Sequence, residues 1–279
     1  MLGIDVGGNK VLCVRLSKGK TVIKRKVEIK KKEKERFLET IEKFIQESRE
    51  EKVGIGFPGL LTRRKIVFSP NLPFFNGFKI VDYLERKYGV EVLLENDANC
   101  FALGEYIRWR RDLVGITLGT GLGCGIIIDG KLYKGMGNAG ELGHTIIKFD
   151  GRKCRCGNIG CVEEYLSERA FLRESKRVMG KSYTPFELSE MCKKGDRRAL
   201  RIFEEMGRIL GILITNITHF LHPEMIVIGG GISKAWKYMK RSCLEEMKRR
   251  CMVKLPKIVR GKEESGAIGA AYLFRYLKH

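Results

Sequence analysis

Leu2-Gly-Ile-Asp-Val-Gly-Gly-Asn-Lys10 opens the chain, and its pattern returns once, at Gly115-Ile-Thr-Leu-Gly-Thr120. Each copy places an apolar strand before a glycine turn. An apolar strand then returns, over residues 11–16 in the first copy and 125–128 in the second, and each copy turns again at Gly-Lys. Such an internal duplication predicts two related lobes. The boundary between them is expected between residues 109 and 112.

The rest of the chain alternates between strand and helix patterns. Apolar residues at helical spacing predict helices over residues 33–51, 80–88, 97–110 and 198–222, whereas short apolar runs predict strands over 53–57, 90–94 and 225–228. Ser233 is expected to be the N-cap of a helix that ends near residue 250. This alternation is typical of an α/β protein.

Composition excludes several classes of protein. The 279 residues are 43% hydrophobic, which is enough for one or two globular domains. No apolar run approaches the ~18 residues of a membrane span, so no membrane segment is expected. The net charge of +21 is compatible with nucleic acid or another polyanion. However, the densest basic run, residues 24–36, contains three glutamates and no aromatic residue, which favours a solvated face.

A second stretch, residues 135–164, concentrates four candidate metal ligands: His144, Cys154, Cys156 and Cys161. Clustered cysteines can also form disulfides or pack as small apolar groups. The chain has nine cysteines, an odd number, and its first residues lack a secretion signal, which favours a reducing cytoplasm and a metal. Four protein ligands leave no open coordination position, so we expect a structural Zn²⁺. The metal would also orient two neighbouring carboxylates, Glu141 and Glu163.

Three glycine-rich turns suggest a nucleotide site. The turn at residues 119–123 leads into a strand, unlike a Rossmann or Walker loop, which leads into a helix. A glycine hairpin between strands still exposes backbone N–H groups that can hold phosphates. The turn at residues 5–8 offers the same hairpin, and the loop at 229–231 allows a base or ribose to approach the backbone. Together they predict that a nucleoside triphosphate is held between the lobes.

Glu95-Asn-Asp-Ala-Asn99 lies where a predicted strand ends and a helix begins. The end of a sheet strand is where α/β proteins place reactive groups. Asp97 is either the N-cap of this helix, which would be common, or a general base for a substrate hydroxyl. In the second case Asp5, at the first hairpin, would help to hold Mg²⁺, directly or through water.

These motifs together resemble the ROK family of sugar kinases and sugar-responsive repressors. The matching segments are residues 5–8, 54–59, 71–73, 95–99, 117–121, 140–144, 154–163 and 228–233. The resemblance implies an α/β, two-lobed ribonuclease H-like (actin-like ATPase) fold with a mixed sheet flanked by helices in each lobe. We expect a small lobe over residues 1–109, with a C-terminal helix (264–279) packed back on it, and a large lobe over 110–263 that carries the zinc loop.

The resemblance also implies an activity and site residues. Asp97 would activate the 6-hydroxyl of a hexose, most simply glucose, for transfer of phosphate from ATP, with Mg²⁺ bound to the nucleotide. The sugar would contact Asn71, Asn96, Asp97, Glu141, His144 and Glu163. ATP would contact Asp5, Gly7, Gly8, Asn9, Lys10, Thr117, Gly119, Thr120, Gly121, Gly229, Gly230 and Gly231. His144 would also be a zinc ligand.

Alternatives within the resemblance stay open. N-acetylhexosamine kinases and kinases for other hexoses would use the same residues, and a non-catalytic sugar-responsive regulator would use the same sugar pocket. The family's repressors carry a helix-turn-helix before the first strand; this chain begins at that strand, so no DNA-binding domain is expected. Asn9 stands where the family usually has Thr, and Phe74 and Phe75 stand where a Trp often follows. The family suggests a homodimer or homotetramer.

Overall fold

The computed structural model describes residues 1–29 and 33–276, and these form two compact units. Unit 1 comprises Met1–Gly115, Gly125–Ala139 and the chain from Gly261 onward; unit 2 comprises Ile116–Cys124 and Gly140–Arg260. Residues 110–115, 125–139 and 261–263, which the sequence interpretation assigned to the large lobe, are grouped with unit 1. Residues 277–279 of the predicted C-terminal helix, and 30–32 of the basic run, lie outside the described residues.

The sheet of unit 1 has five strands in the order β3-β2-β1-β4-β7. β1 pairs with β2 antiparallel and with β4 parallel, and β4 pairs with β7 parallel. The carboxyl ends of β1, β4 and β7 therefore lie at the same edge. The strand bounds are β1 Leu2–Val6, β2 Lys10–Ser17, β3 Lys20–Glu28, β4 Lys52–Phe57 and β7 Glu91–Asn96.

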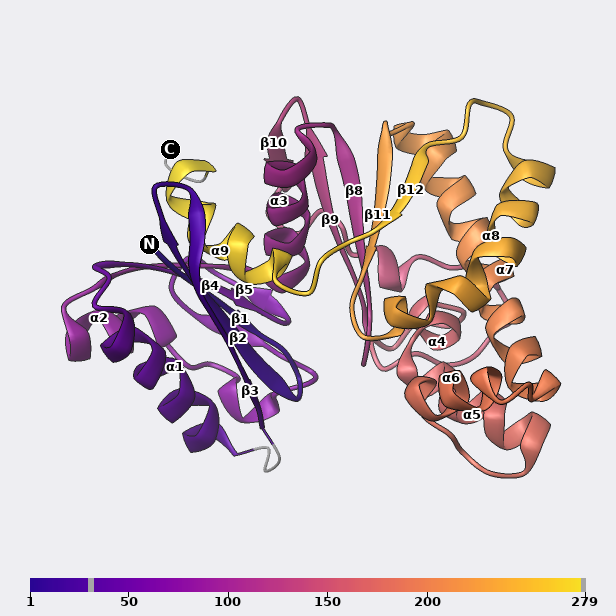
Figure 1. Cartoon of the computed structure of the whole chain (residues 1–279), viewed down its shortest axis with the longest axis horizontal. Helices are drawn as coiled ribbons and strands as arrows, with labels where there is room; N and C mark the ends of the chain where they lie inside the picture. Colours follow the sequence, from indigo (N-terminus) through magenta and orange to yellow (C-terminus); the bar gives the residue numbers. More distant parts are fainter. Residues whose placement is uncertain (30–32, 277–279) are drawn as a thin grey trace. The chain divides into compact units, whose positions relative to one another are not determined.

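Helices cover both faces of this sheet (Figure 1). Successive side chains of β2 belong to the core on one face and then to the core on the other. Val11 and Cys13 belong to the core with α1 and α2, whereas Leu12 and Val14 belong to the core with α3 and α9. Alternate residues of a strand point to opposite faces, so each face receives its own apolar set. The helices of unit 1 are α1 Lys34–Ser48, α2 Ile80–Tyr88, α3 Asp97–Trp109 and α9 Ser265–Tyr276.

Smaller elements follow β4. The strands β5 Leu60–Leu61 and β6 Ile66–Phe68 form a two-stranded sheet, and the 3₁₀ turn η1 Pro73–Phe75 lies in the loop that follows it. Phe75 of this turn packs edge-on against Phe57 at the end of β4, with the ring centroids 5.1 Å apart. This aromatic contact anchors the loop that carries Asn71.

The second five-stranded sheet has the order β10-β9-β8-β11-β12. β10 pairs with β9 antiparallel, and β11 pairs with β12 parallel, so this sheet is mixed as well. The boundary between the two units falls within β8 and β9. The strand bounds are β8 Leu113–Leu118, β9 Leu122–Ile128, β10 Lys131–Tyr133, β11 Met225–Gly229 and β12 Lys257–Arg260.

Unit 2 carries most of its helices after residues 144–161, the segment that contains His144 and the three clustered cysteines. We call this segment the cysteine loop. The long helix predicted over residues 198–222 is confirmed as α7. The prediction that Ser233 caps the following helix is wrong: Ser233 lies inside the 3₁₀ turn η3 (Ile232–Ala235), its hydroxyl donates to the carbonyl of Gly230, and α8 begins at Trp236. The helices are α4 Glu163–Leu166, α5 Glu168–Met179, α6 Pro185–Lys193, α7 Arg197–Leu221 and α8 Trp236–Arg250, and a further 3₁₀ turn is η2 Leu142–His144.

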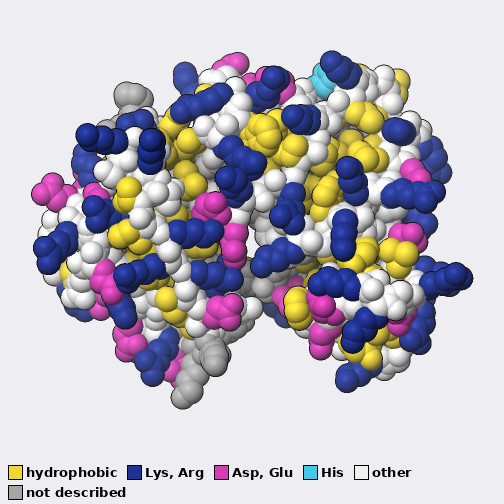
Figure 2. Space-filling view, viewed as in Figure 1, with side chains coloured by type: hydrophobic (Ala, Val, Ile, Leu, Met, Phe, Trp, Pro, Cys, Tyr) yellow, Lys and Arg dark blue, Asp and Glu magenta, His cyan; other side chains and the backbone are white. Residues whose placement is uncertain are grey.

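Two surface properties bear on function. Within residues 1–29 and 33–276, none of the helices has both the length and the apolar character needed to cross a bilayer. On the face shown in Figure 2, Lys and Arg side chains are spread widely, with Asp and Glu side chains among them. This face therefore fits a solvated surface better than a single nucleic-acid groove.

Candidate functional site

The edge of the first sheet brings the predicted reactive carboxylates together. In the parallel register Asp5 lies opposite Gly56, and Gly56 lies opposite Glu95, so β1, β4 and β7 end side by side. Asp97 follows directly, as the first residue of α3. A Cβ built on Gly56 would lie 3.5 Å from the Cα of Asp97, which shows how closely α3 begins against β4.

The N-cap of α3 is Asn96, not Asp97. The side-chain oxygen of Asn96 accepts hydrogen bonds from the backbone N–H groups of Ala98 (2.9 Å) and Asn99 (3.3 Å). Asp97 Oδ1 also accepts from the N–H of Ala98 at 2.9 Å. Because Asn96 performs the capping, the alternative that Asp97 is present only as an N-cap is wrong. Its half-buried carboxylate lies at the N-terminus of α3, where the helix dipole favours the charged form.

The carboxyl group of Asp5 is perturbed by its surroundings. Burial, and then the negative charge of Asp97, raise the pKa of Asp5 from 3.8 to about 7, while Lys10 opposes the shift. A Cβ built on Gly266, in the first turn of α9, would lie 2.8 Å from the Asp5 carboxyl carbon. The start of α9 therefore closes over Asp5, and two interacting carboxyl groups lie at one sheet edge, an arrangement that is common at functional sites.

The first glycine hairpin has a defined geometry. The N–H of Gly7 donates to the carbonyl of Lys10 at 2.8 Å, which closes the turn between β1 and β2. Lys10 Nζ donates to Glu263 Oε1 at 2.8 Å, and this bond lowers the pKa of Glu263 to about 2. The predicted phosphate ligand Lys10 is thus held beside α9, while Asn9 is exposed at the turn.

Asn71 and Asn96 are linked through one turn. The amide of Asn96 donates to the carbonyl of Gly59 at 3.3 Å. Gly59 has a φ of +122°, and a Cβ there would lie 2.2 Å from the carbonyl oxygen of Phe68. Only glycine fits this position, and it packs against the start of the loop that carries Asn71.

Glu95 and Lys134 are site residues that the sequence interpretation missed. Glu95 is buried, and its Oε1 accepts from the N–H of Asn96 and from the side-chain amide of Asn99, each at 3.0 Å. Its Oε2 accepts from Lys134 Nζ at 2.7 Å. Glu95 thus fixes the strand end immediately before Asn96 and Asp97. The presence of Glu95 inside the motif was a signal, but its partner lies 39 residues away.

Unit 2 brings together the other two predicted nucleotide loops. The N–H of Gly119 donates to the carbonyl of Gly121 at 3.0 Å, which closes the hairpin that contains Thr120. Gly230 follows β11 with a φ of +80°, and a Cβ there would lie 2.2 Å from the carbonyl oxygen of Leu118. The loop at residues 229–231 therefore packs against the end of β8, beside the hairpin and Thr117.

Glu163 lies between the cysteine loop and this hairpin. Its Oε2 accepts from the N–H of Leu122 at 3.0 Å, and its Oε1 accepts from Arg169 Nη2 at 2.9 Å. A Cβ on Gly121 would lie 2.5 Å from Glu163 Oε2, so glycine makes room for the carboxylate. Arg169 is a third residue that the sequence interpretation missed, because it belongs to α5, outside every motif.

The four predicted metal ligands converge. The ligand atoms of His144, Cys154, Cys156 and Cys161 all lie within 4.8 Å of one another. His144 Nδ1 lies 3.8 Å from the sulfur of Cys154, and the sulfurs of Cys156 and Cys161 are 3.6 Å apart. Zn–S bonds of ~2.3 Å in a tetrahedron separate two sulfurs by roughly 3.8 Å. The donor set and its spacing therefore fit a tetrahedral zinc.

The loop backbone holds these ligands. The N–H of Cys154 donates to the carbonyl of Asn158 at 2.7 Å, and Val162 donates to Thr145 at 2.9 Å. All nine cysteines, each within the described part of the chain, are free, so the alternative of disulfide bonds is wrong. A hydrogen bond from the N–H of Asn158 lowers the pKa of Cys156, which favours the thiolate that binds metal.

The two ring nitrogens of His144 face different groups. Nδ1 faces the cysteines, whereas Nε2 lies 4.0 Å from Glu141 Oε2. A carboxylate on the far side of a ligating imidazole fixes its tautomer and orientation. The exposed Glu141 thus lies beside His144, and its role as a sugar ligand stays a prediction.

The predicted site residues are therefore gathered within each unit. Unit 1 holds Asp5, Gly7, Gly8, Asn9, Lys10, Asn71, Asn96 and Asp97, and unit 2 holds Thr117, Gly119, Thr120, Gly121, Glu141, His144, Glu163, the three cysteines and residues 229–231.

Known proteins resemble this chain along its whole length. An N-acetyl-D-glucosamine kinase of Photobacterium profundum is 32% identical, over 97% of this chain and 98% of the relative. A glucokinase of Thermotoga maritima is 34% identical, over 84% of this chain and 83% of the relative. A xylose repressor of Caldicellulosiruptor bescii is 35% identical, but the match covers 65% of this chain and half of the repressor.

A solved structure agrees with these relatives. The ROK family glucokinase from Streptomyces griseus, in complex with glucose and AMPPNP, superposes with a TM-score of 0.85 at 30% identity, covering 98% of both chains. The expected α/β fold of the actin-like ATPases is thereby confirmed. Residues 1–276 match the ROK family as a whole, and the chain belongs to that family.

Proposed function

We propose that this protein transfers the γ-phosphoryl group of ATP to the 6-hydroxyl of a hexose. The observation that carries the proposal is the pairing of Asp5 and Asp97 at one sheet edge, with Asn96, not Asp97, capping α3. A non-catalytic sugar-binding protein has no need of a base at this position. The kinase names of the full-length relatives, and the AMPPNP bound to the similar structure, support the same reaction.

The residues divide the chemical step as follows. Asp97 accepts the proton of the 6-hydroxyl, that oxygen attacks the γ-phosphorus, and ADP leaves. Lys134 and Asn99, through Glu95, keep the strand end in place so that Asp97 is oriented before substrate arrives. Asp5 would help to hold Mg²⁺, directly or through water, and the metal would supply positive charge beside the transferred phosphoryl group.

Each unit carries residues that we propose bind a substrate. The hexose hydroxyls are proposed to contact Asn71, Asn96, Glu141, His144 and Glu163. The nucleotide is proposed to contact the hairpin of residues 5–10 in unit 1, and residues 117–121 and 229–231 in unit 2. Zinc, bound by His144 and the three cysteines, would hold the loop that positions Glu141 and Glu163 and would take no part in the chemistry.

Glucose is the proposed substrate, since one close relative and the similar solved structure are named glucokinases. N-acetylglucosamine is the main competitor, because another relative is named for it. A sugar-responsive regulator is the second candidate, favoured by the match to a xylose repressor.

ADP release with Mg²⁺ and ATP, measured across hexoses and N-acetylhexosamines, tests these candidates. Turnover on one sugar, lost in Asp97→Asn while calorimetric binding of that sugar persists, would support the kinase and name its substrate. Binding of a sugar without any turnover would contradict the kinase and favour the regulator.

A further inference from the structure

Lys10, a proposed nucleotide ligand, is bound to a carboxylate of its own chain. Its ammonium group donates to Glu263 Oε1 at 2.8 Å, although the two residues are 253 positions apart in the sequence. Both residues belong to unit 1. Glu263 therefore holds a cation that the proposed function assigns to the phosphates of ATP.

A second lysine lies beside the carboxylate of Glu263. Lys26 Nζ is 3.2 Å from the same oxygen, Oε1, and 3.6 Å from the carboxylate of Glu28. In the register of β2 and β3, Lys26 lies opposite Leu12, two residues along from Lys10. Both lysines thus start from the face of the sheet that α9 covers. If Lys10 leaves, Glu263 keeps Lys26 as a partner.

The backbone that carries Glu263 is fixed from its other side. Glu105 of α3 is fully buried, and its Oε1 accepts hydrogen bonds from the backbone N–H of Lys262, at 2.7 Å, and from the hydroxyl of Ser265. Residues on both sides of Glu263 are therefore anchored to α3. The position of the Glu263 backbone does not depend on its contact with Lys10.

Lys10 is the partner that is able to move. Its side chain is 35% exposed and carries the ammonium group on a flexible four-carbon stem. An exposed pair between a lysine and a carboxylate contributes little free energy. A phosphate group carries more negative charge and more acceptor oxygens than a carboxylate. The bond from Lys10 to Glu263 is therefore one that a bound phosphate can replace.

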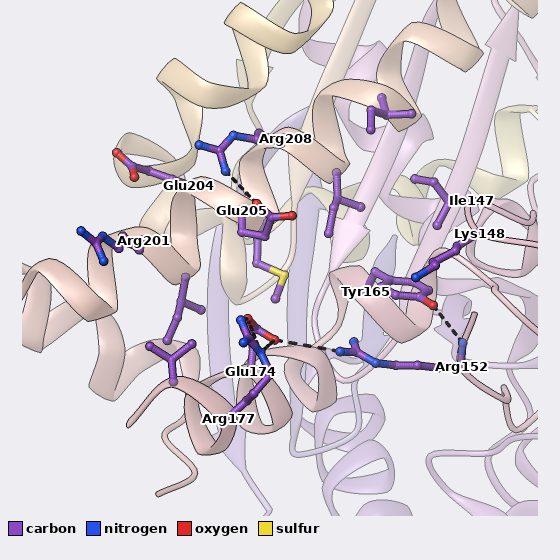
Figure 3. A pocket seen from close by; sticks show the side chains of 15 residues that line it. Ile147, Lys148, Arg152, Tyr165, Glu174, Arg177, Arg201, Glu204, Glu205 and Arg208 are labelled. Atoms are coloured by element: carbon purple, nitrogen blue, oxygen red, sulfur yellow. Dashed lines mark hydrogen bonds and ion pairs between the residues drawn. The ribbon is translucent and has the colours of Figure 1, made fainter. Parts of the chain in front are cut away.

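Carboxylates that two cations share also occur away from the proposed site. In the groove of unit 2 that α5 and α7 line (Figure 3), Glu174 pairs with Arg177 and lies 3.9 Å from Arg152. None of these three residues is proposed to bind a substrate. At Glu263, by contrast, one of the two cations is a proposed ligand, so an exchange of partners affects binding.

We propose that Glu263 competes with the bound nucleotide for Lys10. The phosphates take Lys10, Lys26 stays with Glu263, and Glu263 recovers Lys10 when the nucleotide leaves. Glu263 thereby weakens the binding of both ATP and ADP, which favours release of the product. This inference rests on the proposed function, because it places the phosphates at the hairpin of residues 5–10.

Calorimetric titration of the full chain with AMPPNP or ADP, each with Mg²⁺, tests the competition. Glu263→Gln is expected to lower both dissociation constants about threefold, the scale of one exposed ion pair. Glu264→Gln is the matched control, because Glu264 is the next residue and pairs at 3.0 Å with Lys24, which is not a proposed ligand. An unchanged or weaker affinity in Glu263→Gln, or an equal gain in Glu264→Gln, would overturn the proposal.

A double-mutant cycle tests whether Glu263 acts through Lys10. Lys10→Met is expected to raise both dissociation constants about tenfold, because the phosphates lose a charged hydrogen bond. In the Lys10→Met background, Glu263→Gln should no longer increase the affinity. If the gain persists there, Glu263 acts on the nucleotide without Lys10 and the proposal is wrong.

Lys26→Met tests the exchange of partners. This change removes the second lysine beside Glu263, so Lys10 is held more firmly and both dissociation constants should rise. In the Glu263→Gln background, Lys26→Met should have a much smaller effect. Equal effects in the two backgrounds would show that Lys26 does not act through Glu263.

ADP release measured across sugars separates this inference from the proposed function. A wild-type protein that binds AMPPNP but phosphorylates no sugar contradicts the kinase, whereas the dissociation constants of the variants still decide the role of Glu263. Turnover of a sugar, together with equal nucleotide affinity in wild type and Glu263→Gln, contradicts the competition alone. A wild-type protein that binds neither nucleotide would overturn both.

Discussion

Glu163 accepts a hydrogen bond from the backbone N–H of Leu122 at 3.0 Å, so one carboxylate joins the cysteine loop to the glycine hairpin of residues 119–121. The same carboxylate is held from its other oxygen by Arg169. A group proposed to bind sugar is therefore in direct contact with a turn proposed to bind nucleotide. A movement of the carboxylate is therefore transmitted to the turn, and a movement of the turn to the carboxylate, through this one hydrogen bond.

Loss of the cation beside Glu163 should weaken sugar binding. Arg169→Met leaves Glu163 and Glu164 without their shared partner, and we expect the KM for sugar to rise about tenfold because the carboxylate loses its fixed position. Steady-state ADP release measures this. Arg241→Met, which removes a highly exposed pair with Glu245, is the control and should change neither KM. Equal sugar KM values in wild type and Arg169→Met would show that Arg169 does not position Glu163.

Metal analysis of the purified chain should give about one Zn per chain. Cys156→Ser should lower zinc content and thermal stability and should weaken sugar binding, because metal binding contributes free energy to the fold of the loop. Cys251→Ser lies outside the cluster and should leave all three unchanged. A zinc-free protein of normal stability would remove the basis for the metal loop.

Two glycines of the cysteine loop should differ in their tolerance of alanine. Gly157 has a φ of +94° but open space around it, so Gly157→Ala should cost about 1–2 kcal/mol of backbone strain. Gly160 has a φ of +79°, and a Cβ there would lie 1.7 Å from the carbonyl oxygen of Lys148. Gly160→Ala should therefore cost more, about 3 kcal/mol or greater. Urea unfolding of the zinc-loaded variants measures both, and equal costs would contradict the close approach at Gly160.

The pKa of Asp5 makes stability depend on pH. Because the folded state raises this pKa from 3.8 to about 7, the folded state binds the proton more tightly than the unfolded state. The stabilisation from the protonated group is complete below pH 3.8 and is lost as pH rises through 7. As the pH rises from 5 to 8, the free energy of unfolding of Asp5→Asn should therefore increase relative to that of wild type, by an amount on the order of 1 kcal/mol.

The carboxylate of Asp82 is the control for this dependence of stability on pH. Hydrogen bonding to Arg64 lowers the pKa of Asp82, so its contribution is present above its ordinary pKa and is lost as pH falls. Asp82→Asn should therefore gain nothing relative to wild type between pH 5 and pH 8. Chemical unfolding at the two pH values compares the variants. If the free energies of unfolding of Asp5→Asn and wild type differ by the same amount at both pH values, Asp5 is not protonated in the folded state near pH 6.

Much of the fold follows from local patterns. The strand over residues 53–57 and the helix over 198–222 were predicted to within a residue or so, because each is a periodic apolar run with a clear end. The prediction that Ser233 is an N-cap was wrong because residue type alone does not distinguish an N-cap from a residue within a 3₁₀ turn. The hydroxyl of Ser233 bonds back to Gly230 instead of forward into α8.

The supporting residues of the site were not predictable in the same way. His144 and the cysteines are close in sequence, so their spacing indicates a metal site. Lys134 and Arg169 act through partners on other elements, and ordinary Lys and Arg residues are too frequent in this chain for composition to single them out. Only the folded structure shows which of these Lys and Arg side chains form ion pairs with the carboxylates of the site.

The packing of α9 against β1 has a consequence for synthesis. A Cβ on Gly3 would lie 1.9 Å from the carbonyl oxygen of Ala267, so the first strand and the helix that begins at Ser265 are in backbone contact. The ribosome makes β1 before all of unit 2, and α9 after it. The face of the sheet that α9 covers together with α3 therefore stays partly uncovered throughout translation of unit 2, and unit 1 can be completed only after unit 2 has been made.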